Sequence, residues 1–392
     1  MKFLEGIKIV DLTAAIAGTL GTMVLADLGA DVIKIEPPRG EHYRTAVDGA
    51  ILLAMNRNKR GVALDLKTNE GQDIALRLAN KVDVFIENFI PGTIEKLGLN
   101  YEKVKEVNPS IIYCSVSGFG QDGPMSRRAS YDPVAQAMAG IMIATGEPDG
   151  KPCRQVTSLI DMTASLYATI AILTCLRERD RTGEGQRIDV SMLDTAVSSM
   201  NYFLTWYSFT GKLPTRQGSG AVGWVPYQAF DTKDSPVWIG VSTDKFWQAF
   251  CQALNLEDLE KDARFVADKG RREHREELVA RVAKVCKQYT SEELERKLDE
   301  VRIPVGRLAT VAEVSDNPQV RYRNLIDEFD YPGKGRIKTV KTPIMIGGKL
   351  PAAKMQAPHI GEHTVEVLKE CGYSDTEIQE FLNKGIAVQH KP

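Results

Sequence analysis

The chain has 392 residues, of which 43% are hydrophobic, and its 50 Lys and Arg side chains nearly balance 52 Asp and Glu side chains. This length and composition allow a large buried core and suggest two or three domains. The net charge of −2, with both signs interspersed, argues against a nucleic-acid footprint and against a polybasic membrane anchor. A small molecule is therefore the expected partner.

The six cysteines are far apart, and neither a CxxC pair nor a histidine at metal-ligand spacing accompanies them. We expect reduced thiols in a cytoplasm, without disulfides and without a metal site. The first residues, 1–6, run directly into a strand-like segment and lack the apolar core of a secretory signal. Export by that route is not expected.

The first half of the chain alternates short β-branched runs with helical patterns. The predicted strands cover residues 7–12, 32–36, 62–66, 82–86, 111–116 and 186–191. The predicted helices cover residues 18–28, 69–80, 101–107, 131–144 and 162–179. Strands separated by helices indicate an α/β fold with a parallel sheet covered on both faces, and this large domain is expected over residues 1–195.

The pattern changes after a helical stretch at 193–209. Strands at 227–230 and 237–241, followed by charged helices, predict a smaller α+β domain over residues 215–325. Residues 326–392 are expected to form an extended connector, rich in Pro and Gly, and then two C-terminal helices. The most apolar stretch, 162–176, has only about fifteen residues, fewer than a membrane span needs, so a core helix is predicted.

The segment Gly218 to Gly223 matches the dinucleotide motif GxGxxG, with Gly220 as its second glycine. The motif should open a helix, but the residues that follow, 224–230, are strand-like and interrupted by Pro226. NAD binding, and with it an NAD-dependent oxidoreductase, is therefore only an outside alternative. A mobile loop near a site and an ordinary surface loop remain open.

Histidine is scarce, because the chain has only five. His359 and His363 have the i, i+4 spacing of a metal pair, but no glutamate completes an HExxH motif, so a solvated helix start is favoured. A histidine-based catalytic triad is improbable. Covalent chemistry would then use a carboxylate, a cysteine or a serine.

Asp161 directly precedes the apolar helix. Taken alone, it is most simply the N-cap, whose side chain accepts a hydrogen bond from the first turn. The same place suits a nucleophile, because helix-end N–H groups and the helix dipole would keep a carboxylate ionised. One residue could fill both roles.

Short motifs occur in order along nearly the whole chain. They are residues 4–12 (LEGIKIVDL), 26–36 (ADLGADVIKIE), 56–60 (NRNKR), 64–67 (LDLK), 87–92 (ENFIPG), 117–120 (SGFG), 131–133 (YDP) and 181–186 (RTGEGQ), with Asp161 between the last two. In this order the chain resembles class III CoA-transferases, the family of formyl-CoA transferase and of crotonobetainyl-CoA:carnitine CoA-transferase.

The resemblance implies roles for individual residues. Asp161 falls at the position of the family's catalytic aspartate, and Tyr131 is a candidate hydrogen-bond donor beside it or a packing residue. The implied CoA contacts are Ala15, Leu64, Lys67, Asn88, Phe89 and Lys96, with Arg44 as a further phosphate partner. The two lysines can pair with phosphates, while the side chains of Leu64 and Phe89 would offer apolar surface to the adenine. Lys96 stands where arginine is common, which would lose bidentate geometry.

The resemblance also implies a fold and a reaction. The fold would be an open Rossmann-like large domain completed by the C-terminal residues, with a small domain and two chains interlinked as a homodimer. Coenzyme A would move from an acyl-CoA to a carboxylic acid through an aspartyl anhydride and an aspartyl-CoA thioester, with no permanently bound cofactor. Gly218, Gly220 and Gly223 would be a looser form of the family's glycine gate loop.

At two positions the chain departs from related enzymes, and these differences narrow the expected substrates and reaction. Ile16 replaces the glutamine of formyl-CoA transferase, so oxalate and formate are disfavoured. The α-methylacyl-CoA racemases, which share this fold, carry a histidine where this chain has Tyr131, so racemisation, the main alternative, would lack its base. The acids themselves cannot be read from the sequence. Aromatic residues such as Trp224 and Tyr227 are a weak indication of a bulky or apolar acyl group.

Overall fold

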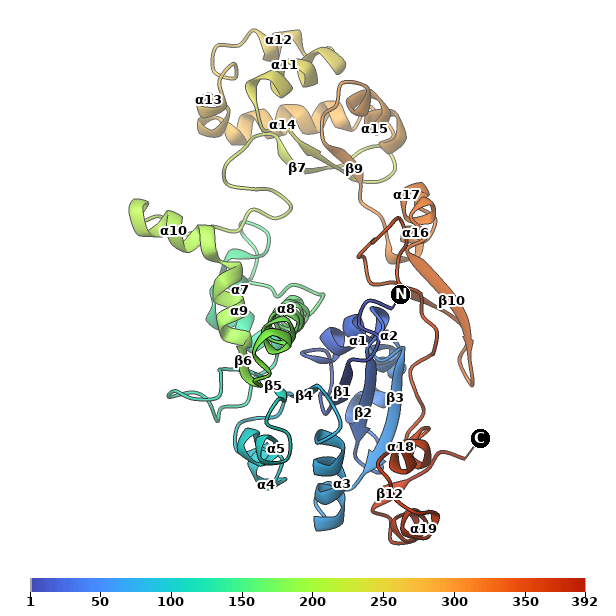
Figure 1. The fold of residues 1–392 in the computed structure, drawn as a ribbon. Helices are drawn as coiled ribbons and strands as arrows, with labels where there is room; N and C mark the ends of the chain where they lie inside the picture. The colour runs from blue at the N-terminus through green and yellow to red at the C-terminus, as the bar shows by residue number, and fades with distance from the viewer. Residues whose placement is uncertain (1, 392) are drawn as a thin grey trace. The chain divides into compact units, whose positions relative to one another are not determined.

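The computed structural model describes residues 2–391, and the chain divides into two compact units. The first unit comprises Met1–Gly140, Gln155–Asn201 and Pro318–Pro392. The second comprises Ile141–Arg154 and Tyr202–Asn317. Each unit is thus assembled from stretches that are separate in the sequence, as the colours of Figure 1 show.

A seven-stranded sheet forms the centre of the first unit (Figure 1). In spatial order its strands are β12 (Ala387–Val388), β3 (Lys59–Leu64), β2 (Asp31–Glu36), β1 (Lys8–Asp11), β4 (Val84–Glu87), β5 (Ile112–Ser117) and β6 (Gln186–Ser191). Every adjacent pair is parallel except β12 and β3. The predicted α/β fold with a mostly parallel sheet is therefore confirmed, while the short antiparallel edge strand was not predicted.

Helices cover both faces of this sheet, which explains why its strands are apolar on both sides. On one face the core joins strand residues such as Val10 and Phe85 to α3 (Asn69–Ala79), α4 (Thr93–Lys96), α5 (Tyr101–Val107), α18 (Thr364–Glu370) and α19 (Asp375–Asn383). On the other face lie α1 (Thr19–Asp27) and α8 (Leu159–Thr182). The remaining helices of this unit are η1 (His42–Arg44), η2 (Ala46–Gly49), α2 (Ala50–Met55), α6 (Asp132–Met138), α9 (Met192–Ser199) and α17 (Pro318–Tyr322).

The strand order reverses between β1 and β4. The chain proceeds from β1 to β2 and β3 on one side and from β4 to β5 and β6 on the other. Such a reversal leaves a crevice at the carboxyl ends of the two strands, where open α/β sheets bind ligands. The loops that leave β1 and β4, at residues 12–18 and 88–92, therefore define the place to look for a site.

Helix α8 is longer than the sequence predicted, since it has 24 residues and ends at Thr182, before Gly183, whose φ is 76°. Its length and composition would suffice to cross a membrane. In the fold, a stripe of small and apolar residues at i, i+4 spacing is buried against α1 and strands β5 and β6; its members are Ile160, Ala164, Ala168, Ile172 and Leu176. This packing agrees with the predicted core helix. The close crossing needs Gly21 on α1, where a Cβ would lie 2.7 Å from the Ser165 carbonyl oxygen.

The C-terminal stretch returns to β3. The part expected to be an extended connector includes an antiparallel hairpin, β10 (Ile326–Tyr331) and β11 (Gly335–Val340), so that expectation was wrong there. Farther on, the Gly61 amide donates to His363 Nδ1 (3.1 Å) and the Ala63 amide donates to Thr364 Oγ1 (3.1 Å). The last helices and β12 thus complete the large unit beside β3 (Figure 1).

The second unit is an α+β structure with its own core. Its antiparallel sheet joins β7 (Tyr227–Phe230), β8 (Val237–Gly240) and β9 (Val305–Arg307). The helices are α7 (Ile141–Ala144), most of α10 (Asn201–Thr210), α11 (Asp244–Ala253), α12 (Glu257–Glu260), α13 (Asp268–Glu273), α14 (Arg275–Cys286), α15 (Ser291–Glu300) and α16 (Val311–Val314). The helix predicted at 131–144 is broken at Gly140, whose φ of 84° favours glycine, into α6 and α7.

Candidate active site

A cavity of about 380 Å³ lies at the switch point of the sheet. Its wall is formed by the loops after β1, β4 and β5, by Tyr43 of η1 and by Asp161 of α8. Ligand pockets of this kind typically occupy some 300–1,000 Å³ and combine apolar walls with a few polar groups. Asp161 and Tyr131, which the sequence analysis singled out separately, face this one cavity.

Asp161 is the third residue of α8 and not its cap. The helix starts at Leu159 after Ser158, which has φ 40° and ψ 51° and makes no side-chain capping bond. The free N–H groups are instead satisfied by Asp132, whose Oδ2 accepts from the amides of Ile160 (2.7 Å) and Asp161 (3.3 Å). The predicted capping role of Asp161 is therefore wrong, and its side chain is left to line the cavity.

The carboxyl group of Asp161 is unusually easy to protonate. Burial, together with the nearby Asp132 carboxylate, raises the pKa of Asp161 from 3.8 to about 7. The expectation that the helix end would keep this group ionised is corrected, because Asp132 already occupies the positive end of α8. Asp161 is thus a basic, poorly solvated carboxylate near neutral pH.

The loop after β1 is fixed against Asn88, which follows β4. The Asn88 side chain accepts from the Ala14 amide (2.9 Å) and donates to the carbonyl oxygens of Ala14 and Ala17 (2.8 Å each). Ala15, also part of the cavity wall, has φ 63°, and its amide donates to Glu41 Oε2 (3.1 Å). Asn88 lines the cavity as well, but its three side-chain bonds make it an anchor of the loop, a role that the sequence did not reveal.

Ser165 connects this loop to the helix of Asp161. Its Oγ accepts from the Gly18 amide (2.7 Å) and lies 2.9 Å from the carbonyl oxygens of both Ile16 and Asp161. These contacts therefore hold the loop at a fixed position along α8. No sequence motif marks Ser165, because its partners on the loop lie almost 150 positions away.

A cluster of buried charged side chains supports the loop after β1. Lys59 pairs with Asp11 (2.9 Å), and Lys34 donates to the Thr13 carbonyl (2.7 Å) and pairs with Glu41 (3.3 Å). Burial lowers the pKa of Lys59 to about 8, although Asp11 opposes that shift. Because every charge in such a cluster needs its partner, these groups hold the backbone in one geometry.

Arg44, predicted to bind a phosphate, belongs to this framework. Its guanidinium donates to both carboxylate oxygens of Glu36 (2.7 and 2.5 Å) and to the Pro358 carbonyl (3.0 Å). The charge of Arg44 is thus paired with a buried carboxylate, and its contact with a CoA phosphate stays a prediction. The pair fixes the turn η1, and thereby Tyr43.

Two tyrosines line the cavity with Asp161. Tyr43 is half-buried, and burial, followed by the proximity of Tyr131 and Asp161, raises its pKa. Tyr131 stands at the N-cap position of α6 and is 70% exposed, so it is not a core packing residue within this chain. Tyr43 was missed by the sequence analysis, since it lies in an irregular turn without a motif.

The remaining predicted CoA contacts divide into two groups. Phe89 lines the cavity, and Lys67 and Lys96 are exposed. Leu64 is 0% exposed and packs in the core, where β12 pairs with β3 beside it. The expectation that the Leu64 side chain offers apolar surface to an adenine is therefore corrected.

Arg128, at the cavity wall and 5.9 Å from the Phe119 ring centre, was not predicted.

The Gly218–Gly223 loop belongs to the second unit. Within that unit the Gly218 amide donates to the Gly146 carbonyl (2.8 Å), and Arg272 donates to the Gly223 carbonyl (3.2 Å). Gly220 approaches Arg275 so closely that a Cβ there would lie 2.9 Å from Nη2. The strand β7 follows the loop, so the helix that a dinucleotide motif requires is not there.

The histidines that were considered as a metal pair make other contacts. His363 accepts from the Gly61 amide, and the rings of His359 and His390 stack with centroids 4.5 Å apart. Within residues 2–391, no group of three or more His, Cys, Asp or Glu side chains has the geometry to hold a metal ion.

Comparisons with known proteins identify the family of the chain. The family model described as "CoA-transferase family III" matches residues 4–364. The succinyl-CoA:glutarate CoA-transferase of Homo sapiens is 36% identical over 100% of this chain and 91% of its own length. The acetyl-CoA:oxalate CoA-transferase of Acetobacter aceti is 36% identical over 93% of this chain and 95% of its own. A crystal structure of a CAIB/BAIF family protein from Brucella suis has 35% identity and a TM-score of 0.84 over 94% of this chain and 99% of that one.

Proposed function

The chain belongs to CoA-transferase family III and is a CoA-transferase, and from that premise we propose that Asp161 is the covalent nucleophile of the transfer. The observation that carries this proposal is the Asp161 carboxylate in a cavity at the sheet's switch point, with a pKa raised to about 7 by burial. A desolvated, basic carboxylate is a better nucleophile than an ordinary surface one.

The first half-reaction has two steps. An Asp161 carboxylate oxygen attacks the thioester carbonyl of the donor acyl-CoA, the C–S bond breaks, and CoA leaves as the thiolate. The thiolate then attacks the Asp161 carbonyl of the mixed anhydride and expels the donor acid as a carboxylate, which leaves an aspartyl-CoA thioester. The acceptor carboxylate repeats these steps in reverse order and departs as the new acyl-CoA.

The groups around Asp161 suit the charges that develop in these steps. Each attack places negative charge on a carbonyl oxygen, which hydrogen-bond donors can stabilise. Tyr43 and Tyr131 line the same cavity as Asp161, and the loop after β1 is held against α8 by Ser165. We assign the hydroxyls of the two tyrosines as donors to the substrate. Exclusion of water by bound acyl-CoA would preserve the anhydride.

Coenzyme A would lie along the same crevice. Phe89 lines the cavity wall and offers an aromatic side chain there, and the exposed side chains of Lys67 and Lys96 carry charges suited to the phosphates. Gly218, Gly220 and Gly223 are retained as the gate loop that the family resemblance implies. A permanently bound cofactor has no role in it, because CoA thioesters are the substrates.

We propose succinyl-CoA as a donor and a dicarboxylic acid as the acceptor. The human relative is named for succinyl-CoA and glutarate, and the A. aceti relative for acetyl-CoA and oxalate. Arg128 at the cavity wall could pair with a second carboxylate. Oxalate itself is expected to be a poor acceptor here, because Ile16 offers no polar group in the loop after β1.

Replacing the nucleophile tests the mechanism. Asp161→Ala should abolish transfer from succinyl-CoA while CoA still binds, and Asp180→Ala, at the far end of the same helix, should remain active. In the wild type, succinyl-CoA followed by borohydride or hydroxylamine should modify Asp161, as read by mass spectrometry. Full activity of the Asp161→Ala variant would overturn the proposal. Washout of α-deuterium from a 2-methylacyl-CoA, without modification of Asp161, would instead indicate a racemase.

We also propose that two copies of the chain form a homodimer in the cytoplasm. Apolar side chains on α8 and α9 of the first unit are exposed, namely Leu166, Tyr167, Ile170 and Val197. A second copy is the proposed cover for this face, in keeping with the dimer that the family resemblance implies. The wide separation of the cysteines supports a reducing compartment.

A further inference from the structure

The side chain of Asp132 is packed against the start of the helix that contains Asp161. Asp132 is the first residue of α6 and is 1% exposed. The two N–H groups that its Oδ2 accepts, from Ile160 (2.7 Å) and Asp161 (3.3 Å), belong to the first turn of α8. Such groups have no partner inside their own helix. Asp132 therefore caps α8 from a different element.

The second oxygen of Asp132 is also held. Gln136, on the next turn of α6 and 0% exposed, donates to Asp132 Oδ1 (2.5 Å), while its own oxygen accepts from the Gln155 amide (3.0 Å). Every group that contacts the Asp132 carboxylate in these bonds is an N–H donor. These three N–H donors hold both oxygens of the buried Asp132 carboxylate in place.

Asp132 is the charged group whose proximity raises the pKa of Asp161. Burial contributes most to the raised pKa of Asp161, and Asp132 contributes next. From the other elements, Tyr43 of η1, Tyr131 before α6 and Arg128 of the preceding loop face the same cavity. The loop after β1 adds no titratable group, because residues 14–18 are Ala, Ala, Ile, Ala and Gly.

We propose that Asp132 is a positioning residue whose fixed negative charge makes aspartyl-CoA the favoured form of Asp161. The inference rests on the covalent mechanism proposed above. Forming aspartyl-CoA converts the Asp161 carboxylate into a neutral thioester and releases the donor acid as a carboxylate into water. The charge that faces Asp132 is thereby removed from a buried place, and an ordinary solvated carboxylate takes its place.

The same charge affects both halves of the reaction. In each mixed anhydride the CoA thiolate can attack either carbonyl. Attack at the Asp161 carbonyl expels the substrate's carboxylate, whereas attack at the substrate's carbonyl expels the more basic Asp161 carboxylate next to Asp132. The less basic carboxylate is the better leaving group, so the covalent enzyme holds CoA while donor and acceptor acids exchange. The aspartyl-CoA form of the enzyme would thus persist after the donor acid has left and until the acceptor acid reacts.

Asp132→Asn tests this role, because asparagine keeps an oxygen acceptor of similar shape but removes the charge. The enzyme is equilibrated with succinyl-CoA at several succinate concentrations, and aspartyl-CoA is quantified by borohydride reduction and mass spectrometry. For a pKa fall of about one unit, the equilibrium constant for aspartyl-CoA formation should fall by up to about tenfold. The acid limb of kcat/KM should move to lower pH.

Three controls separate the outcomes. Asp132→Glu keeps the charge and should preserve the equilibrium constant even if turnover falls, while Asp180→Asn, which removes a charge about 28 Å away along α8, should change neither quantity. If the asparagine variant does not fold, Asp132→Ser removes the charge and keeps an oxygen acceptor. A lower turnover with an unchanged constant and an unmoved acid limb would overturn the inference and leave only a structural cap. Failure of the mechanism itself would look different, because the wild type would then show no modification at Asp161.

Discussion

At the scale of single residues, burial of Asp161 has a chemical benefit and an energetic cost. The desolvation that makes the carboxylate basic also disfavours its charged form in the folded protein. The folded-state pKa is about 7, above the ordinary value of 3.8, so the folded chain binds this proton more tightly than the unfolded chain does. The stability from this group is therefore fully present below pH 4 and is lost as the pH rises through 7.

We therefore expect Asp161→Asn to be more stable than the wild type at alkaline pH. Removing the buried charge should increase the free energy of unfolding by about 2 to 4 kcal/mol at pH 8, and by less at pH 5. Urea unfolding of both proteins at the two pH values measures the difference. A gap of equal size at both would contradict the assignment of the cost to ionisation of Asp161. Asp180→Asn, exposed on the same helix, is the matched control.

The acidity of Asp161 also predicts a pH profile. Transfer requires the ionised carboxylate, so kcat/KM with succinyl-CoA should fall about tenfold per pH unit well below pH 7. Initial rates between pH 5 and 9 measure this limb. A flat profile down to pH 5 would mean that the Asp161 pKa stays near its ordinary value in the working enzyme.

At the scale of elements, the site depends on how the loop after β1 is held between β4 and α8. Asn88, at the end of β4, supplies three hydrogen bonds to this loop, and Ser165 on α8 supplies the link on the opposite side. Parallel strands bring their carboxyl ends to one edge, so loops distant in sequence can brace each other there. The geometry around Asp161 thus depends on three elements together.

Asn88→Ala should loosen this arrangement. Loss of the three side-chain bonds is expected to reduce the free energy of unfolding by about 1–3 kcal/mol and to raise KM for acyl-CoA, because the loop forms part of the cavity wall. Denaturant unfolding and steady-state kinetics measure the two effects. Asn88→Asp, which can still accept from the Ala14 amide, should be intermediate. Unchanged stability and KM would show that the loop holds its shape without Asn88.

At the scale of the whole molecule, α8 is exposed along one apolar face while its other face covers the sheet. Leu166, Tyr167 and Ile170 on α8 are 46%, 44% and 59% exposed, and Tyr167 approaches Ser198 of α9 (3.3 Å between hydroxyl oxygens). A contiguous apolar surface of this kind usually marks an interface. The proposed homodimer would cover it.

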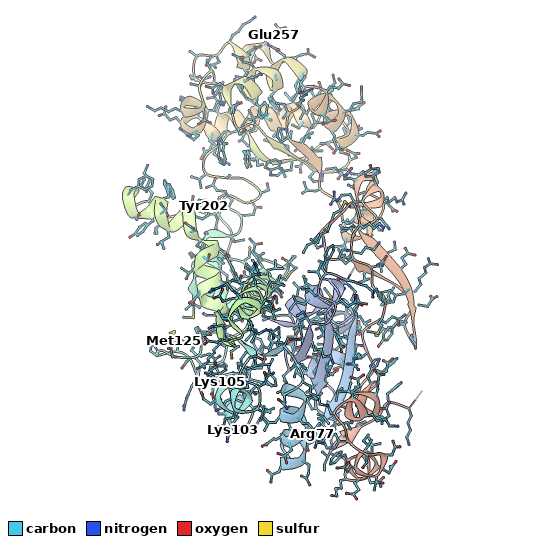
Figure 2. The ribbon with its side chains drawn as sticks, viewed as in Figure 1. Arg77, Lys103, Lys105, Met125, Tyr202 and Glu257 are labelled. Carbon is cyan, nitrogen blue, oxygen red and sulfur yellow. The ribbon has the colours of Figure 1, made fainter. Side chains whose placement is uncertain are left out.

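Ile170→Glu should therefore weaken the dimer without unfolding the chain, because the side chain is exposed within one copy. Light scattering coupled to size-exclusion chromatography should show a shift toward the monomer at micromolar protein. Lys103→Glu, on α5 and labelled in Figure 2, introduces the same new side chain elsewhere and should leave the mass unchanged. A wild-type monomer at every concentration would contradict the proposed dimer.

The sequence alone was sufficient to predict the parallel strands and most of the helices. The strands β6 and β7 and the helix α5 have the predicted bounds, because the hydrophobic period and the helix start depend on residues close together in the chain. Family motifs identified Asp161 before its surroundings were visible. These features share one property: each is encoded within a few turns or strands of the sequence.

The partners of those residues were decided by the tertiary structure. Asp161 is not a cap because Asp132, 29 positions earlier, fills that role; Arg44 is paired with Glu36; and β12, more than 300 residues beyond β3, helps bury Leu64. Burial and charge pairing depend on distances in space, which local periodicity does not contain. The sequence thus identified Asp161 as the proposed nucleophile, and only the fold determined how basic its carboxylate is.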